Sequence, residues 1–398
     1  MAGRSPRTRG GLAVIGDRIR ERRKQLGLTQ EQLAAGRFDR SYISRIEANE
    51  VIPPLDTLRV IAERLGKPLS YFIGDPDEYT RRKIVHDYLS RAARSLKKQR
   101  YQEAVDLLQV ALGLLETSDD GPLLLSVHID LAHAYAALGR TEEGTRHLNE
   151  AMSLLSRVPL ASCPPDTPAR LHYTRGQLAF LRGQYKEAAQ AFRLADAAAV
   201  READRVRARI GLGSALFRLG EYEESLRAYS YGLEVAEKGV PRIMLAACHH
   251  GAGVCYGALG NLDLAAYHTE RALQLYQGQD PERALHASHD LGIILARKGA
   301  YRPARERLRN CLRAYKERSD LEALASVLID LAGIELAGGR HRRALLLSRL
   351  AKHFAKRARC PRLYLSATQQ EVAALDRLDP QAARLLDAVV KDLRALGG

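Results

Sequence analysis

The chain of 398 residues contains no tryptophan, only five cysteines and just 6% aromatic residues. The cysteines form no CxxC pair, which argues against a zinc module or a disulfide framework and favours a reduced, cytoplasmic protein. No apolar run approaches the ~20 residues that a membrane-spanning helix needs. The basic N-terminus leads into no apolar signal core. We therefore expect neither membrane insertion nor secretion.

Sequences that mark catalytic sites are also missing. The chain holds no HExxH, GxSxG or Walker motif. The glycine pairs at 211–213 and 251–253 resemble pieces of a nucleotide loop, but neither follows a predicted strand, and both lie where a packed helix needs small residues. We expect no enzyme and no cofactor.

Basic residues exceed acidic ones, 62 to 47, for a net charge of +15. A surplus of this size favours a polyanionic partner, although solvated helix faces also carry many arginines. The length predicts two or more domains. An apolar fraction of 46% with 27% charged residues is typical of folded proteins.

Residues 12–75 predict five short helices, the last beginning at Pro68. Thr29 caps the second helix, with Gln32 at the position that completes a capping box. Asp39 is the candidate cap of the third helix. Two short helices joined by a tight turn that contains glycine describe a helix-turn-helix.

In the third helix, Ile43 and Ile46 face the predicted core and polar residues lie on the opposite side. Arginine can bond guanine in the major groove, and serine can bond bases or phosphates. A residue at a helix N-terminus can help to hold a phosphate. The candidate DNA-contacting residues are Gln30, Arg40, Ser41, Tyr42, Ser44 and Arg45.

Three motifs carry a family resemblance: LTQEQLA at 28–34, RSYISRIE at 40–47 and PPLDTL at 53–58. Together they resemble the Xre/phage-repressor class of DNA-binding domains. The turn at 34–40 is one residue shorter than in most phage repressors. In this it is similar to the RRNPP group of peptide-pheromone regulators from Gram-positive bacteria.

The resemblance implies an all-α, lambda-repressor-like domain in which Gln30 clamps a phosphate of the operator. Arg40, Ser41 and Arg45 would face bases. It also implies a structural ion pair between Arg23 and Glu47. The alternative is a degenerate helix-turn-helix kept for docking, which exposed arginines on the third helix disfavour.

From residue 80 onward, a short motif recurs at 99, 139, 183, 220, 260, 299 and 339, with separations of 37 to 44 residues. A fixed period of this size marks a solenoid. Gly220, Tyr222 and Ser225 illustrate its pattern. The pattern resembles the tetratricopeptide repeat, in which glycine ends helix A, an aromatic residue seats the turn and a small residue lets helix B approach. The period of about 40 is similar to that of RRNPP receptors, which implies a right-handed superhelix.

The expected organisation has five parts. They are a disordered basic tail at 1–11, a helix-turn-helix domain at 12–75, a linker at 76–82, about seven repeats at 83–357, and C-terminal capping or dimerisation helices at 358–398.

Helices A are expected to line the concave face, where solenoids bind ligands. Asp130, Asp290 and Asp330 recur at one helix-A position, and their carboxylates can only accept hydrogen bonds. They would therefore favour the N–H groups, ammonium or basic side chains of a peptide; alternatively, they pair with neighbouring arginines and touch no ligand. The remaining candidate groove residues are His133, Arg170, Tyr173, Gln177, Arg207, Ser214, His250, His286 and His289.

His249, His250, His286 and His289 fall on two successive helices A. A metal site needs convergent ligands, and ordinary groove histidines are the simpler interpretation. We expect no metal.

The sequence thus predicts a cytoplasmic, homodimeric transcription regulator that binds a double-stranded DNA operator, while its resemblance to RRNPP receptors implies a short signalling peptide as ligand. Two alternatives remain open. The repeats could dock a folded protein partner, or they could only dimerise a repressor that has no ligand.

Overall fold

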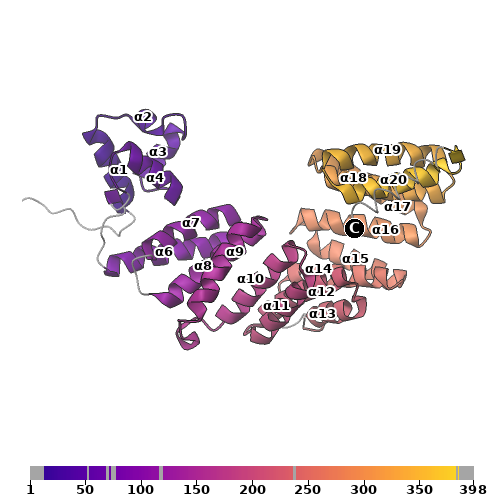
Figure 1. The fold of residues 1–398 in the computed structure, drawn as a ribbon, viewed down its shortest axis with the longest axis horizontal. Coiled ribbons are helices and arrows are strands. Elements are labelled where there is room, and N and C mark those ends of the chain that lie inside the picture. Colours follow the sequence, from indigo (N-terminus) through magenta and orange to yellow (C-terminus); the bar gives the residue numbers. More distant parts are fainter. Residues whose placement is uncertain are drawn as a thin grey trace, which may run out of the picture. The chain divides into compact units, whose positions relative to one another are not determined.

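The computed structural model describes residues 13–51, 53–68, 71–72, 78–115, 120–235, 239–381 and 384. Throughout these ranges the regular elements are helices and no strand occurs, which confirms the predicted all-α class (Figure 1). None of the described helices combines the length and apolar character needed to cross a bilayer. The expected tail at 1–11 lies outside the described residues. So does the helix expected after Pro380, apart from Gln381 and Arg384.

By its internal contacts the chain divides into two units, Met1–Val200 and Arg201–Gly398. The first unit begins with the helix-turn-helix. Its helices are α1 (Ala13–Gln25), α2 (Gln30–Ala34), α3 (Arg40–Glu47) and α4 (Leu55–Arg64). One apolar core joins them, including the fully buried Ile19, Leu33, Ile43 and Ile61.

Local sequence signals set the ends of α2 and α3. The predicted capping box is present, because the Thr29 hydroxyl accepts from the Gln32 N–H at 3.0 Å and the Gln32 side chain accepts from the Thr29 N–H at 2.7 Å. Ala35 and Gly36 then take φ values of 33° and 71°, which turn the chain toward α3. The prediction for Asp39 is wrong in one respect: it precedes α3, but its side chain makes no capping bond.

Helical hairpins make up the rest of the first unit. They are α6 (Glu78–Lys97) with α7 (Tyr101–Leu115), α8 (Gly121–Ala137) with α9 (Thr141–Leu155), and α10 (Thr167–Leu181) with α11 (Tyr185–Ala198). A short 3₁₀ turn, η1 (Leu160–Ser162), lies between the last two pairs.

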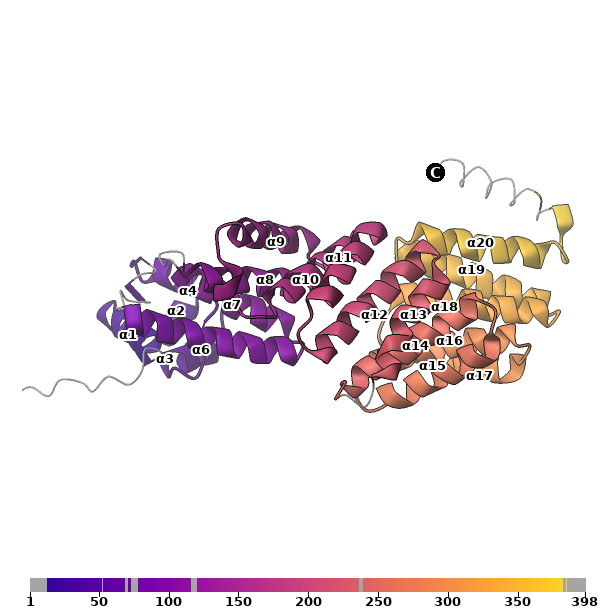
Figure 2. The same ribbon diagram turned by 90° about the horizontal axis from the view of Figure 1, so that it is seen from below.

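The second unit continues the same pattern (Figure 2). Its elements are α12 (Glu202–Leu219) with α13 (Tyr222–Glu234), α14 (Arg242–Ala258) with α15 (Leu262–Tyr276), α16 (Pro281–Arg297) with α17 (Tyr301–Glu317), α18 (Leu321–Ala337) with α19 (His341–Arg357), and α20 (Pro361–Leu375).

In every helix pair after α6 and α7, the predicted turn glycine follows helix A in the left-handed region. Gly220 has a φ of 83° and closes α12, and Gly260 has a φ of 85° after α14. The motif copy at 99 has glutamine at this position, and Gln99 still adopts a φ of 58°. The conformation is therefore a property of the hairpin, and glycine reaches it with the least strain.

The glycine pairs that resembled nucleotide loops lie inside helices and serve packing. Tyr229 of α13 occupies the space between Gly213 of α12 and Gly251 of α14. A Cβ atom would lie 2.7 Å from its ring at Gly213 and 2.3 Å from it at Gly251. The missing side chains let three helices close around one tyrosine, which is 6% exposed.

Candidate functional site

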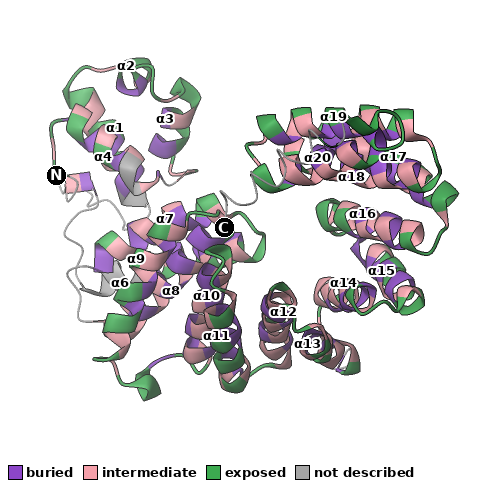
Figure 3. Ribbon diagram, turned by 45° about the vertical axis from the view of Figure 1, so that its right-hand side comes forward, coloured by how far each residue is buried: buried purple, intermediate pink, exposed green. Residues whose placement is uncertain are grey.

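The outer side of α3 is the candidate DNA-binding surface. Ile43 and Ile46 are buried, while the predicted contact residues Arg40, Ser41, Ser44 and Arg45 are exposed. Figure 3 shows this change from buried to exposed residues around α3. Two guanidinium groups and two hydroxyl groups on an accessible helix are suited to base edges and phosphates.

A buried ion pair holds α3 against α1, as the family resemblance implies. Arg23 donates two hydrogen bonds to Glu47, at 2.5 and 2.9 Å, and a third to the carbonyl of Leu28 at 2.6 Å. The side chain of Glu47 is only 3% exposed. Burial alone would raise the pKa of Glu47, but hydrogen bonds from Arg23 and Gln30 outweigh it and lower that pKa.

Gln30 lies at the first position of α2, as a phosphate clamp would. Its side-chain amide donates to Glu47 at 2.9 Å, so the ion pair fixes its direction. The predicted phosphate contact therefore depends on a residue whose side chain is already positioned by the domain core.

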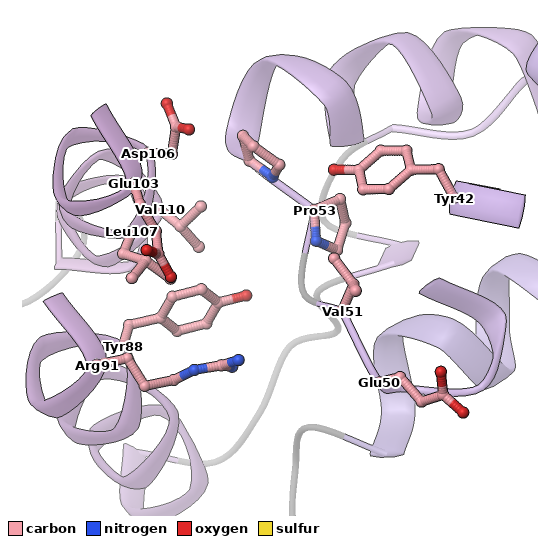
Figure 4. Close-up of a pocket in the computed structure, with 11 residues that line it drawn as sticks. Tyr42, Glu50, Val51, Pro53, Tyr88, Arg91, Glu103, Asp106, Leu107 and Val110 are labelled. Atoms are coloured by element: carbon pink, nitrogen blue, oxygen red, sulfur yellow. The ribbon is translucent and has the colours of Figure 1, made fainter. Parts of the chain in front are cut away.

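Tyr42, also a predicted DNA contact, is half-buried and lines a pocket of about 340 Å³. Figure 4 shows Tyr42, Val51 and Pro53 on one side of this pocket, with Tyr88 and Leu107 of the first hairpin on the other. Within the described part of the chain, the buried hydroxyl of Tyr88 has no hydrogen-bond partner. Burial raises the pKa of this phenol, which therefore stays neutral.

In the first unit, five of the predicted groove residues come together between α8 and α10. Asp130 forms an ion pair with Arg170. His133 Nδ1 lies 2.8 Å from Gln177 Oε1, and its ring centre is 6.3 Å from that of Tyr173. This cluster offers charged, amide and aromatic groups, all on helices A.

In the second unit, the other two predicted carboxylates bind histidines of the preceding helix A. His250 Nε2 of α14 lies 2.7 Å from Asp290 Oδ2 of α16. His289 Nε2 of α16 lies 2.8 Å from Asp330 Oδ2 of α18. His286, on the same helix as His289, lies 3.4 Å from the hydroxyl of Tyr315.

Two candidate groove residues stand apart from these pairs. Arg207 donates to Asp204 of its own helix at 3.1 Å. The hydroxyl of Ser214 donates to the carbonyl of Ile210 at 3.0 Å and lies 2.9 Å from the hydroxyl of Tyr229, inside a hairpin.

All three carboxylates that were predicted to line a groove thus have a partner on a neighbouring helix A. Arginine is the partner of Asp130, as in the alternative interpretation, whereas histidine takes that place at Asp290 and Asp330. The histidine pairing was missed from the sequence. Its signal was available, because His250 and Asp290 are separated by 40 residues, which is one repeat.

Two histidine pairs between helices A and B were also not predicted from the sequence. His128 Nδ1 lies 3.1 Å from His147 Nδ1, and His249 Nδ1 lies 2.9 Å from His268 Nδ1. Burial, reinforced by the partner imidazole, lowers the pKa of His147 and of His249 to about 4.

His249 therefore pairs with His268 of helix B. The other three histidines of the group predicted from the sequence, His250, His286 and His289, have their partners elsewhere. Among the described residues, no three histidine, cysteine or acidic side chains converge as metal ligands would.

Comparison with known proteins identifies both kinds of domain. A helix-turn-helix family matches residues 19–72, and a tetratricopeptide-repeat family matches residues 204–278. The chain therefore joins a helix-turn-helix to tetratricopeptide repeats, as predicted.

Among curated proteins, the immunity repressor protein of Bacillus phage phi105 is 40% identical over 63 residues, which cover 16% of this chain and 44% of the repressor. The CTR9 homolog of Arabidopsis thaliana is 33% identical over 161 residues, 40% of this chain. The chain spans only 14% of that protein's length.

Among solved structures, the chain is similar to the quorum sensor NprR from B. thuringiensis. Its apo form has a TM-score of 0.63 at 14% identity, with 94% of this chain and 99% of that chain covered. NprR in complex with its cognate peptide NprX has a TM-score of 0.51 at 14% identity, with coverage of 77% and 78%. At this identity, the likeness shows a shared fold.

Proposed function

We propose that the protein is a cytoplasmic, homodimeric transcription regulator whose helix-turn-helix binds an operator and whose repeats bind a short signalling peptide. In this proposal the chain is a ligand-responsive regulator and has no enzymatic activity. The observation that carries the proposal is the exposed polar side of α3, joined in one chain to helices A that hold paired carboxylates.

The DNA half of the proposal rests on Arg40, Ser41, Ser44 and Arg45, which the domain core leaves exposed. Replacing Arg45 by alanine should cost about 1–3 kcal/mol at one base position of the operator, while Gln30→Ala weakens binding to all sequences alike. Fluorescence anisotropy with an operator series and a random duplex separates the two effects. Arg157→Ala, which removes another exposed arginine, is the matched control. Equal losses on operator and random DNA for both variants would refute these roles.

The peptide half rests on the side chains between helices A, which combine carboxylates, imidazoles and an aromatic ring. The shared fold with NprR, which has been solved with a cognate peptide, supports the same ligand class. Calorimetry with synthetic peptides of about five to ten residues, taken from short reading frames beside the gene, tests this half. Asp290→Asn should weaken binding, whereas Asp263→Asn, an exposed carboxylate on α15, should not. Absence of heat from every candidate peptide contradicts the proposal.

We propose dimerisation because the DNA-binding module is small. One helix-turn-helix makes a small interface, so specific binding usually requires two modules on spaced half-sites. A peptide changes operator binding only if it prefers one arrangement of the dimer, typically by about 1–3 kcal/mol. Sedimentation equilibrium with and without peptide measures dimerisation. Operator affinity at saturating peptide measures how far the peptide changes DNA binding.

A further inference from the structure

Basic charge is concentrated on two successive helices B of the second unit. Helix α17 carries six basic and two acidic residues, and α19 carries six basic and none acidic. These two helices therefore hold a net charge of +10, against +15 for the whole chain. The other helices B, α7, α9, α11, α13 and α15, together hold five basic and twelve acidic residues.

This contrast matters because all seven helices occupy the same place in their repeats. A general preference of the chain for arginine would enrich all of them. Five are neutral or acidic and two are strongly basic, so the charge belongs to a location on the protein.

Some of these cations have a structural purpose and others do not. Arg305 of α17 binds the buried Glu335, while Arg349 and Lys352 of α19 bind the buried Glu371. Eight others are exposed and, within the described part of the chain, form no ion pair. We call these eight the basic face: Arg302, Arg309, Arg313, Lys316, Arg342, Arg343, Lys356 and Arg357.

The two helices that carry the basic face pack against one apolar cluster. Leu312 of α17 packs in the same apolar cluster as Leu347 and Phe354 of α19. Figure 1 shows both helices within the C-terminal part of the second unit. From Arg343 to Arg357, α19 extends about 21 Å at 1.5 Å per residue. That is the length of roughly six base pairs of duplex DNA.

We infer that the basic face binds the phosphate backbone of duplex DNA, as a second contact outside the helix-turn-helix. Arginine donors suit phosphate oxygens, and α19 carries no carboxylate of its own to repel them, whereas α17 carries Glu306 and Glu317. This choice of DNA rests on the function proposed above: a helix-turn-helix that binds duplex raises the local concentration of duplex for the rest of the chain, which favours DNA over other polyanions. The contact carries no base specificity, so it should strengthen operator and random DNA equally.

The test uses the full chain with Arg342, Arg343, Lys356 and Arg357 all replaced by glutamine. Binding to a random 40-base-pair duplex is followed by fluorescence anisotropy between 50 and 200 mM salt. Each lost phosphate contact should reduce the slope of log affinity against log salt by about 0.9. We expect a slope shallower by roughly two to four and at least a tenfold weaker affinity at 50 mM salt.

A matched control removes four exposed cations elsewhere: Lys98, Arg157, Lys186 and Arg227, each to glutamine. It lowers the net charge equally, so a general charge effect would change both variants alike and would overturn the inference. Circular dichroism establishes that both variants are folded. Because random DNA without peptide is the probe, failure here leaves operator and peptide binding by the proposed regulator unaffected.

Two further measurements distinguish other occupants of this face. Leu346 and Leu350 lie on α19 between the cations and are 69% and 42% exposed. A protein partner would bury them, whereas phosphate contacts would not need them. Leu346→Ser with Leu350→Ser should therefore leave DNA affinity unchanged, and a loss would contradict a phosphate contact. Salt-sensitive self-association that disappears in the glutamine variant, with an unchanged DNA slope, would assign the face to a second copy of the chain.

Discussion

Replacing Glu47 by glutamine should loosen the helix-turn-helix without changing its exposed side chains. The carboxylate accepts two bonds from Arg23 and one from Gln30, and it is 3% exposed. Glutamine keeps the shape but leaves the guanidinium, itself 11% exposed, without an anion. Breaking a buried pair in this way costs about 3–5 kcal/mol. Because Arg23 keeps its bond to the carbonyl of Leu28, we expect a loss near the lower limit, about 3 kcal/mol.

Hydrogen exchange measured by mass spectrometry can follow this domain separately from the repeats. A loss of about 3 kcal/mol should speed exchange of amides in α1 and α3 by roughly a hundredfold. Glu31→Gln, which neutralises an exposed carboxylate on α2, should leave the exchange rate of these amides unchanged. Replacing both Arg23 and Glu47 by leucine should cost less than Glu47→Gln, since no buried charge remains. If Glu47→Gln and Glu31→Gln exchange at the same rate, the ion pair does not stabilise the domain.

Acid and packing provide two further predictions. Burial lowers the pKa of His147 and of His249 to about 4, below the value of about 6.5 for histidine in the unfolded chain. Their contribution to the stability of the fold is therefore complete above pH 6.5 and is lost as the pH falls toward 4. Allowing for partial exposure, each should cost about 1–2 kcal/mol, and urea midpoints between pH 4 and 7 should flatten in His147→Phe. Gly251→Ala forces a methyl group against Tyr229 and should destabilise the second unit by about 1–3 kcal/mol. Gly257→Ala on the same helix, where the nearest atom is 3.8 Å away, should be neutral or stabilising in thermal unfolding followed by circular dichroism.

Glu47 should also lose its contribution to stability in acid, but at a lower pH than the two histidines. Its pKa is lowered in the folded domain, so the ion pair stabilises at neutral pH and is lost as the pH falls through that lowered value. The histidines act at higher pH than this carboxylate. Acid should therefore weaken the repeats before it breaks the contact between α1 and α3.

The hairpins were predictable because their signal is local and repeated. A glycine such as Gly220 marks the end of helix A, where a left-handed residue is required, and that requirement recurs in each repeat. Gln99 shows the limit of this reasoning, since the hairpin imposes the same φ on a residue that gives no signal. Asp39 shows another, because a residue type suited to capping does not ensure that its side chain forms the bond.

Contacts between repeats were harder to predict than the repeats themselves. The buried Ile43 and exposed Arg45 follow from helical spacing within α3 alone. The pair formed by His250 and Asp290 depends on how one helix A lies against the next. Helical periodicity places each of them on a face, but it does not determine which two faces meet. The structure supplies that relation, and with it the partners of Asp130, Asp290 and Asp330.

In the peptide-binding function proposed above, these partners would determine what a ligand must offer in order to bind. A ligand cation that takes a carboxylate must replace an existing hydrogen bond, and the displaced imidazole must find water or stay unpaired. His250 is 20% exposed and its partner Asp290 38%, whereas His289 and Asp330 are 11% and 27% exposed. Water can solvate a displaced His250 more readily than a displaced His289, which would be left as a buried polar group at a cost of about 1–3 kcal/mol. A basic ligand should thus engage Asp290 in preference to Asp330, and Asp290→Asn should weaken its binding more than Asp330→Asn. Equal losses in calorimetry would mean that exposure of the displaced histidine does not govern the exchange.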